Sequence, residues 1–223
     1  MLDWDRLAAR NRVVRWDARG HGRSAGTDDP DDYRWDNLGR DLVALADVLG
    51  VDAFVAGGVS MGAATALHAA VQAPSRVAGL VLVLPPTAYE TRAAPADEYE
   101  TGADLVEERG VGAYVERQSA EPVPEILTPI ADVYHAAPKI ADGLLPAALR
   151  GAGASDLPSP EQIQAIAAPA LVLAWTTDPG HPLSTAELLA ELLPRAELDV
   201  ARQLRDVIGW TDRVEAFLDR VSS

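Results

Sequence analysis

The residues Phe54-Val-Ala-Gly-Gly-Val-Ser-Met-Gly-Ala-Ala-Thr-Ala-Leu67 decide how this chain folds. The apolar first half predicts a buried strand, and the alanine-rich second half predicts a helix. The two halves meet at Gly58-Val-Ser-Met-Gly62, so that a single serine stands at the turn. We therefore expect a buried strand to pass directly into a helix, with Ser60 at the point where they join.

The chemistry of such a turn makes Ser60 a candidate nucleophile. A sharp turn strains the backbone, and we expect a side chain at position 58 or 62 to collide with neighbouring backbone. Because Ser60 lies at a helix N-terminus, free backbone N–H groups point to where an oxyanion would form. The N–H of Met61 is the natural first donor to that oxyanion. The alternative is a tight glycine-rich turn that carries an inert serine.

The rest of the chain alternates strands and helices. Strands are predicted at Val77–Leu84, Ala170–Trp175 and Glu197–Ala201, and a short one at Arg12–Trp16. Residues 87–168 lack strand-like alternation and predict several short helices, among them Asp97–Arg109, Ile126–His135 and Lys139–Leu149. This order predicts an α/β fold, in which a mainly parallel sheet is flanked by helices on both faces.

Helix boundaries are also readable from the sequence. Leucines recur at helical spacing from Leu38 to Leu49, and Gly50 predicts a left-handed stop. Ser159–Gln162 and Ser184–Glu187 have the pattern of capping boxes, and Thr211 is expected to cap the last helix. Residues 151–155, which are rich in Gly and Ala, predict a linker.

A second motif makes the assignment more specific. Asp17-Ala-Arg-Gly-His-Gly-Arg-Ser24 resembles the Asp-x-Arg-Gly-x-Gly-x-Ser loop of α/β-hydrolases, and Gly58–Gly62 matches their Gly-x-Ser-x-Gly nucleophile elbow. The resemblance covers nearly the whole chain. It implies an α/β-hydrolase core at residues 1–86 and 169–223, with a helical cap insertion at 87–168. The alternative for the insertion is a peripheral helical hairpin that does not contact substrate.

The resemblance also implies a catalytic triad, in the chain order Ser, Asp or Glu, His. Asp178 is the implied acid, because it follows the strand after the insertion; alternatively it forms an Asx turn before Pro179. The family's late histidine would fall near Asp199, and an aspartate is a weak base for a hydroxyl. His181 is the replacement nearest to Asp178 and completes the candidate catalytic set. Its three-residue spacing from Asp178 also fits a structural His-Pro corner.

The remaining histidines are weaker candidates. His21 is expected to be a residue of the Asp17–Ser24 loop, and His68 to be packed or partly exposed on the helix after Ser60. His135 lies in the insertion, and the sequence does not indicate which way it faces.

The resemblance begins at the family's first helix, so that roughly three preceding strands and the loop that supplies a second oxyanion donor have no counterpart in this sequence. Either the strand containing Val13 moves beside Val55, or one edge of the sheet is open. An open edge pairs readily with another chain, which predicts a homo-oligomer.

Composition excludes several other classes of function. The chain has 223 residues, and 34 acidic against 19 basic residues give a net charge of −15. This balance argues against nucleic-acid and anionic-membrane partners. There is no cysteine, which excludes disulfides and thiolate metal sites. We see no signal peptide or membrane span, and the expected location is cytoplasmic.

The resemblance implies a serine hydrolase that acts on small carboxylic esters or lactones through an acyl-enzyme at Ser60, without metal or organic cofactor. The missing late histidine and oxyanion donor predict slow or no turnover. Two alternatives are a non-catalytic binding or interaction protein of the same fold and a fragment of a full-length hydrolase.

Overall fold

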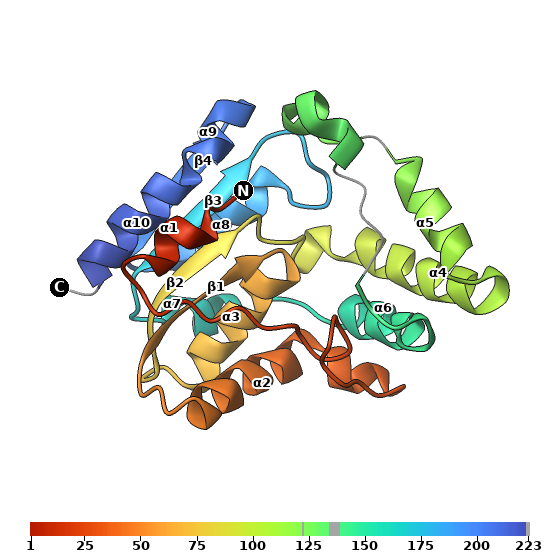
Figure 1. The fold of residues 1–223 in the computed structure, drawn as a ribbon, viewed down its shortest axis with the longest axis horizontal. Helices are drawn as coiled ribbons and strands as arrows, with labels where there is room; N and C mark the ends of the chain where they lie inside the picture. Colours follow the sequence, from red (N-terminus) through yellow and green to blue (C-terminus); the bar gives the residue numbers. More distant parts are fainter. Residues whose placement is uncertain (122, 134–138, 222–223) are drawn as a thin grey trace.

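The computed structural model describes residues 1–121, 123–133 and 139–221. Its centre is a parallel sheet with the strand order β1-β2-β3-β4 (Figure 1). The strands are β1 (Phe54–Val59), β2 (Val77–Val83), β3 (Ala170–Trp175) and β4 (Ala196–Ala201). The predicted α/β fold is confirmed. Four of the five predicted strands are present: the strand before Ser60 is β1, and the predicted bounds of β2, β3 and β4 are correct to within one residue.

Alternation of side chains along the strands divides the core into two layers. In β2, Leu80 and Leu82 join one cluster of buried residues, whereas Val81 and Val83 join a second cluster on the opposite face. The first face is covered by α2 (Trp35–Val48), α3 (Met61–Gln72), α7 (Pro160–Gln164) and α8 (Leu183–Leu192). The second face is covered by α1 (Trp4–Ala8), α9 (Leu204–Ile208) and α10 (Trp210–Val221).

The segment between β2 and β3, here called the helical insertion, extends to one side of the sheet (Figure 1). It has a small core of its own, formed by Ala103, Val106, Ile140, Leu145 and Leu149. Its elements before α7 are η2 (Tyr89–Thr91), α4 (Ala93–Arg109), α5 (Val111–Ser119), η3 (Glu125–Val133), η4 (Asp142–Leu144) and α6 (Leu145–Gly153).

Several predicted boundaries inside the helical insertion are wrong. The helix expected at Ile126–His135 is the 3₁₀ segment η3, and its last two positions lie outside the described residues. The helix expected at Lys139–Leu149 begins only at Leu145, where Pro146 occupies the first turn. Because α6 continues to Gly153, most of the expected linker at 151–155 is helical.

The N-terminal half of the sheet also departs from the prediction. Residues 12–16 form no strand, and Val14 is 46% exposed. A strand needs a partner for its backbone N–H and C=O groups, and none of the four described strands pairs with this segment. β1 pairs only with β2 among the described strands, so the second expected outcome, an open edge, is the one observed.

Helix ends were predicted with mixed success. Gly50 adopts a φ of 63° directly after the C-cap of α2, and Ser159 with Gln162 forms a reciprocal capping box at α7, as predicted. Ser184 is not a cap, because α8 begins at Leu183. Thr211 lies inside α10, where its Oγ1 accepts a hydrogen bond of 2.9 Å from the N–H of Asp3.

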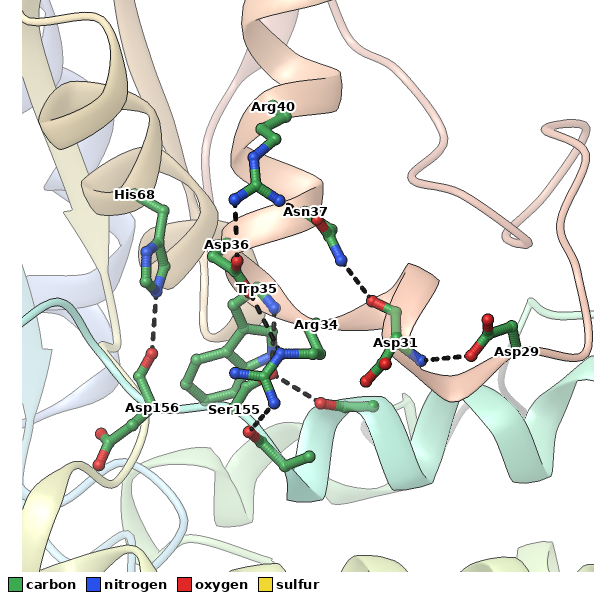
Figure 2. A network of polar contacts seen from close by, with 12 residues as sticks. Asp29, Asp31, Arg34, Trp35, Asp36, Asn37, Arg40, His68, Ser155 and Asp156 are labelled. Carbon is green, nitrogen blue, oxygen red and sulfur yellow. Dashed lines mark hydrogen bonds and ion pairs between the residues drawn. The ribbon is translucent and has the colours of Figure 1, made fainter.

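A polar network fixes the end of the helical insertion to the helices of the first face (Figure 2). The N–H of Trp35, at the start of α2, donates to Ser155 Oγ at 3.0 Å, and Arg34 Nη1 donates to the carbonyl of Ala154 at 2.9 Å. His68 of α3 contacts the carbonyl of Asp156 through Nε2 at 2.9 Å. Two of these contacts provide partners for backbone carbonyls that follow the end of α6, those of Ala154 and Asp156.

Arg92 completes this connection from inside the protein. It is 5% exposed, and its Nε donates to the carbonyl of Ser155 at 2.9 Å, while Nη2 donates to the carbonyl of Ala152. The guanidinium also lies 4.4 Å from the ring centroid of Trp35 and 5.2 Å from that of Tyr99. One buried cation therefore connects the start of α4, the end of α6 and the start of α2.

We predict that Arg92→Met lowers the free energy of unfolding by about 2–4 kcal/mol, because the carbonyls of Ser155 and Ala152 lose buried donors. Urea denaturation followed by circular dichroism measures the change. Arg40→Met is the matched control: its side chain is 62% exposed, and the expected change is within about 0.5 kcal/mol. Equal unfolding midpoints for the two variants would contradict the role given to Arg92.

Candidate active site

Ser60 occupies a strained turn between β1 and α3. Its φ of 54° and ψ of −114° lie where residues with a side chain are rarely found. The turn is anchored on both sides: the N–H of Ser60 donates to the carbonyl of Val83 at 3.0 Å, and its carbonyl accepts from Ala63 N at 2.9 Å. Ser60 is thus held at the carboxyl end of the sheet, as the sequence predicted.

The two glycines of the elbow have different roles. A Cβ on Gly58 would lie 2.7 Å from both Cα and C of Gly62, so this position has no room for a side chain. A Cβ on Gly62 would have no neighbour within 4 Å. The expected collision is therefore confirmed at position 58, where the backbone of Gly62 leaves no room for a Cβ. It is wrong at position 62, where a Cβ would face open space.

Ser60, His181 and Asp178 form a continuous hydrogen-bonded line. Ser60 Oγ lies 2.8 Å from His181 Nε2, and His181 Nδ1 lies 2.9 Å from Asp178 Oδ2. A carboxylate only accepts hydrogen bonds, which places the imidazole proton on Nδ1 and leaves Nε2 free to accept from the serine hydroxyl. This arrangement is suited to removing a proton from Ser60.

The short spacing between Asp178 and His181 does not prevent this alignment. The N–H of His181 approaches both the carbonyl and the Oδ1 of Asp178, at 3.3 Å in each case. The loop therefore folds back on itself, and both side chains leave it on the same side. The alternative for His181 was a structural His-Pro corner. That description is incomplete, because the imidazole of His181 also contacts Ser60.

Asp178 is held by more donors than the sequence indicates. Its side chain is 7% exposed, and Oδ2 accepts from Trp175 Nε1 at 2.8 Å, while Oδ1 accepts from Gly180 N at 3.0 Å. Burial raises the pKa of Asp178, but hydrogen bonds from His181, Trp175 and Gly180 and the charge of His181 lower that pKa more. The pKa of Asp178 consequently lies below its ordinary value, which keeps the carboxylate ionised.

Sequence reasoning missed Trp175. The available signal was its position as the last residue of β3, three residues before Asp178. The side chain of a residue at the end of a strand can face either the core or the following loop. The sequence does not show which of the two the indole N–H of Trp175 contacts.

The other candidate bases lie elsewhere. His21 Nδ1 contacts the carbonyl of Arg19 at 2.9 Å, and His21 pairs with Ile140 in an isolated antiparallel bridge. His68 belongs to the network of Figure 2, and burial lowers its pKa. His135 lies outside the described residues.

The position expected for the family's late base is also wrong. Asp199 lies within β4 and forms an ion pair of 2.8 Å with Arg213 Nε of α10. Its carboxylate is therefore engaged at the second face of the sheet. The imidazole that contacts Ser60 Oγ comes instead from the loop between β3 and α8.

The N-terminus of α3 lies directly after Ser60. Met61 is the first residue of this helix, and the N–H groups of a first turn have no intrahelical acceptor. The helix dipole adds partial positive charge at the same place. The Met61 N–H is thus available to a negatively charged oxygen beside Ser60.

The described residues lack two kinds of feature. They contain no group of three or more His, Cys, Asp or Glu side chains that could hold a metal ion. Among their helices, none combines the length and the apolar character needed to cross a membrane.

Comparison with known proteins agrees with this architecture. Residues 5–109 match the family model described as alpha/beta hydrolase fold. The chain is 30% identical over 196 residues to 3-oxoadipate enol-lactonase 2 of Acinetobacter baylyi, covering 84% of this chain and 69% of that protein.

Solved structures agree as well. A thermophilic esterase from Thermogutta terrifontis superposes with a TM-score of 0.71 at 25% identity, covering 93% of this chain and 79% of that one. A hydrolase from Pseudomonas aeruginosa gives a TM-score of 0.78, also at 25% identity, and the match covers 96% and 84% of the two chains.

We predict that Gly58→Ala lowers the free energy of unfolding by about 1–3 kcal/mol, because its Cβ must displace the backbone at Gly62. Thermal unfolding measures the loss. Gly62→Ala is the matched control, and we expect it to be neutral or stabilising by up to about 1 kcal/mol, because alanine replaces glycine in a helix without a clash. If the two substitutions had the same effect, the packing described for the elbow would be incorrect.

Proposed function

Because the chain belongs to the α/β-hydrolase fold family, we propose that it is a serine hydrolase of small carboxylic esters or lactones. The observation that supports this most strongly is the line from Ser60 Oγ through His181 to Asp178, with successive distances of 2.8 and 2.9 Å. The likeness to an enol-lactonase and an esterase supports the ester class of substrate. A lactone is a cyclic ester, so one mechanism serves both.

In the acylation step, Ser60 Oγ attacks the carbonyl carbon of the ester, and its proton passes to His181 Nε2. The carbonyl oxygen becomes an oxyanion that the N–H of Met61 stabilises. Asp178 remains ionised and stabilises the imidazolium. The carbon–oxygen bond to the leaving group then breaks, and His181 returns the proton to that alkoxide. An alcohol departs, or in a lactone remains tethered to the acyl group.

Deacylation repeats these steps with water. His181 Nε2 takes a proton from the water as its oxygen attacks the acyl carbon, and the Met61 N–H again binds the oxyanion. Collapse of the intermediate breaks the bond to Ser60 Oγ, which recovers its proton from His181. The product is a carboxylic acid, and the enzyme returns to its starting state.

Within the part of the chain that the structure describes, we assign one oxyanion donor to the proposed site, the Met61 N–H. Removing a single donor from such a site typically costs about 3 kcal/mol in the barrier. We therefore propose slow turnover, caused by weak oxyanion stabilisation and not by the lack of a base. The helical insertion is proposed to act as a cap, residues 87–168, over a core of residues 1–86 and 169–223, and to select a small-molecule substrate.

We predict that wild-type protein hydrolyses a short-chain aryl ester and reacts with a fluorophosphonate probe, whereas Ser60→Ala does neither. His181→Gln should lower turnover by about 10² to 10⁴-fold, the usual contribution of a general base. His21→Gln is the matched control, because the imidazole of His21 contacts the carbonyl of Arg19, and its turnover should remain near that of the wild type. Turnover that survives Ser60→Ala would exclude the proposal, and an unlabelled wild-type serine would favour a non-catalytic protein.

We also propose that a second copy of this chain pairs with the open edge of β1. The N–H groups of Phe54 and Ser60 donate toward β2, to Arg76 and Val83. Alternation then directs the backbone polar groups of residues 55, 57 and 59 away from β2. Val13 and Val55 both pack against the buried cluster on the second face of the sheet, which supports a position of the segment 10–23 near this edge. That segment has five arginines and one aspartate in a chain whose net charge is −15, and an acidic second copy would complement it.

We expect a dimer by sedimentation velocity at low salt, and weaker association at high salt, because exposed charges are screened. Arg12 is exposed and has no ion pair within the described residues. Arg12→Glu should therefore weaken the dimer without changing the unfolding midpoint. A single monomeric mass over a wide concentration range would refute this assembly.

A further inference from the structure

We propose that Trp175 is a positioning residue, whose indole N–H fixes the carboxylate of Asp178 and thereby aims His181 at Ser60. The inference rests on the proposed function for its catalytic consequence. It begins from Asp178 Oδ2, which is shared by two donors: Trp175 Nε1 at 2.8 Å and His181 Nδ1 at 2.9 Å.

The four acceptor directions of the carboxylate are all occupied. Oδ1 accepts from the backbone N–H of Gly180 at 3.0 Å and of His181 at 3.3 Å, and Oδ2 accepts from the two side chains. The backbone donors belong to the same loop as Asp178 and move with it. Trp175 is the donor that ties the carboxylate to the sheet.

Trp175 is itself held by its surroundings. It is the last residue of β3, is 2% exposed, and stacks on Trp210 with ring centroids 6.0 Å apart and an angle of 21° between planes. Its ring is thus held by strand, core and stacking together. A donor on so rigid a support needs little reorganisation when charge develops on the neighbouring imidazole.

The second tryptophan of the stack provides a matched comparison. Trp210 is fully buried like Trp175, but its Nε1 has no hydrogen-bond partner within the described residues. A tryptophan-to-phenylalanine substitution removes one indole N–H and one ring at either position. Only at position 175 does it also remove a donor to Asp178.

The decisive experiment compares Trp175→Phe with Trp210→Phe in the full chain, on the aryl ester used above. We expect Trp175→Phe to lower kcat about tenfold with KM nearly unchanged, and Trp210→Phe to change kcat less than about twofold. The hydrogen bond from Trp175 lowers the pKa of Asp178, so its loss should move the acidic limb of the kcat profile to higher pH. A purely structural role would not shift that limb. Equal kinetics and pH profiles for the two variants would overturn the inference.

A double-mutant cycle tests whether Trp175 acts through Asp178. In an Asp178→Asn background, Trp175→Phe should cause little further loss of kcat, because the carboxylate on which it acts is already absent. If the two losses instead multiply, Trp175 acts independently of Asp178 and the inference fails.

A measurement on the protein with both tryptophans intact covers the case in which Trp175→Phe does not fold. Nuclear magnetic resonance can follow the indole N–H signals in wild type and in Asp178→Asn. We expect the Trp175 signal to move and the Trp210 signal to stay, and an unmoved Trp175 signal would overturn the inference. Because this readout needs no turnover, an inactive wild type would count against the proposed function alone.

Discussion

The structure depends on one unfavourable backbone conformation, the positive φ of Ser60. A non-glycine residue holds such a conformation only where its surroundings fix it, and here a hydrogen bond to β2 and the first turn of α3 do so. The close approach of Gly58 to Gly62 lets strand and helix meet at this angle. The same turn sets Ser60 Oγ at the carboxyl end of the sheet and places α3 against the first face. The same turn therefore determines both how β1 and α3 meet and where the candidate nucleophile lies.

Most of the sheet and the helices beside it could be predicted from the sequence, because local periodicity reports the burial of side chains. Val77–Val83 and Ala170–Trp175 are apolar on both faces and are buried on both. The segment at residues 12–16, Arg-Val-Val-Arg-Trp, also favours a strand yet forms none, since pairing depends on a neighbour that sequence pattern alone cannot supply. The start of α6 was missed for a related reason, because its boundary depends on Pro146 and on packing within the helical insertion.

The candidate site was predictable in its members but not in its geometry. Ser60 and Asp178 follow from the elbow motif and from the order of elements. The orientation of His181 depends on a loop that folds back through two contacts of its own backbone N–H, which residue spacing does not reveal. The indole of Trp175 was missed because its partner is fixed by the same loop. Asp199 was misplaced because counting residues ignores the ion pair that holds it to α10.

Asp178 and His181 lie in a single loop, so one movement of that loop can break the line of hydrogen bonds that leads to Ser60. Three separate segments would each have to be kept in register with the others, whereas here the acid and the base travel together. One local opening of residues 176–182 would disconnect both from Ser60 at once, and one reclosing would restore both. Because Asp178 and His181 are only three residues apart, we expect the two side chains to lose and regain their contacts together. The proposed acid and base would then be assembled or lost as one cooperative unit.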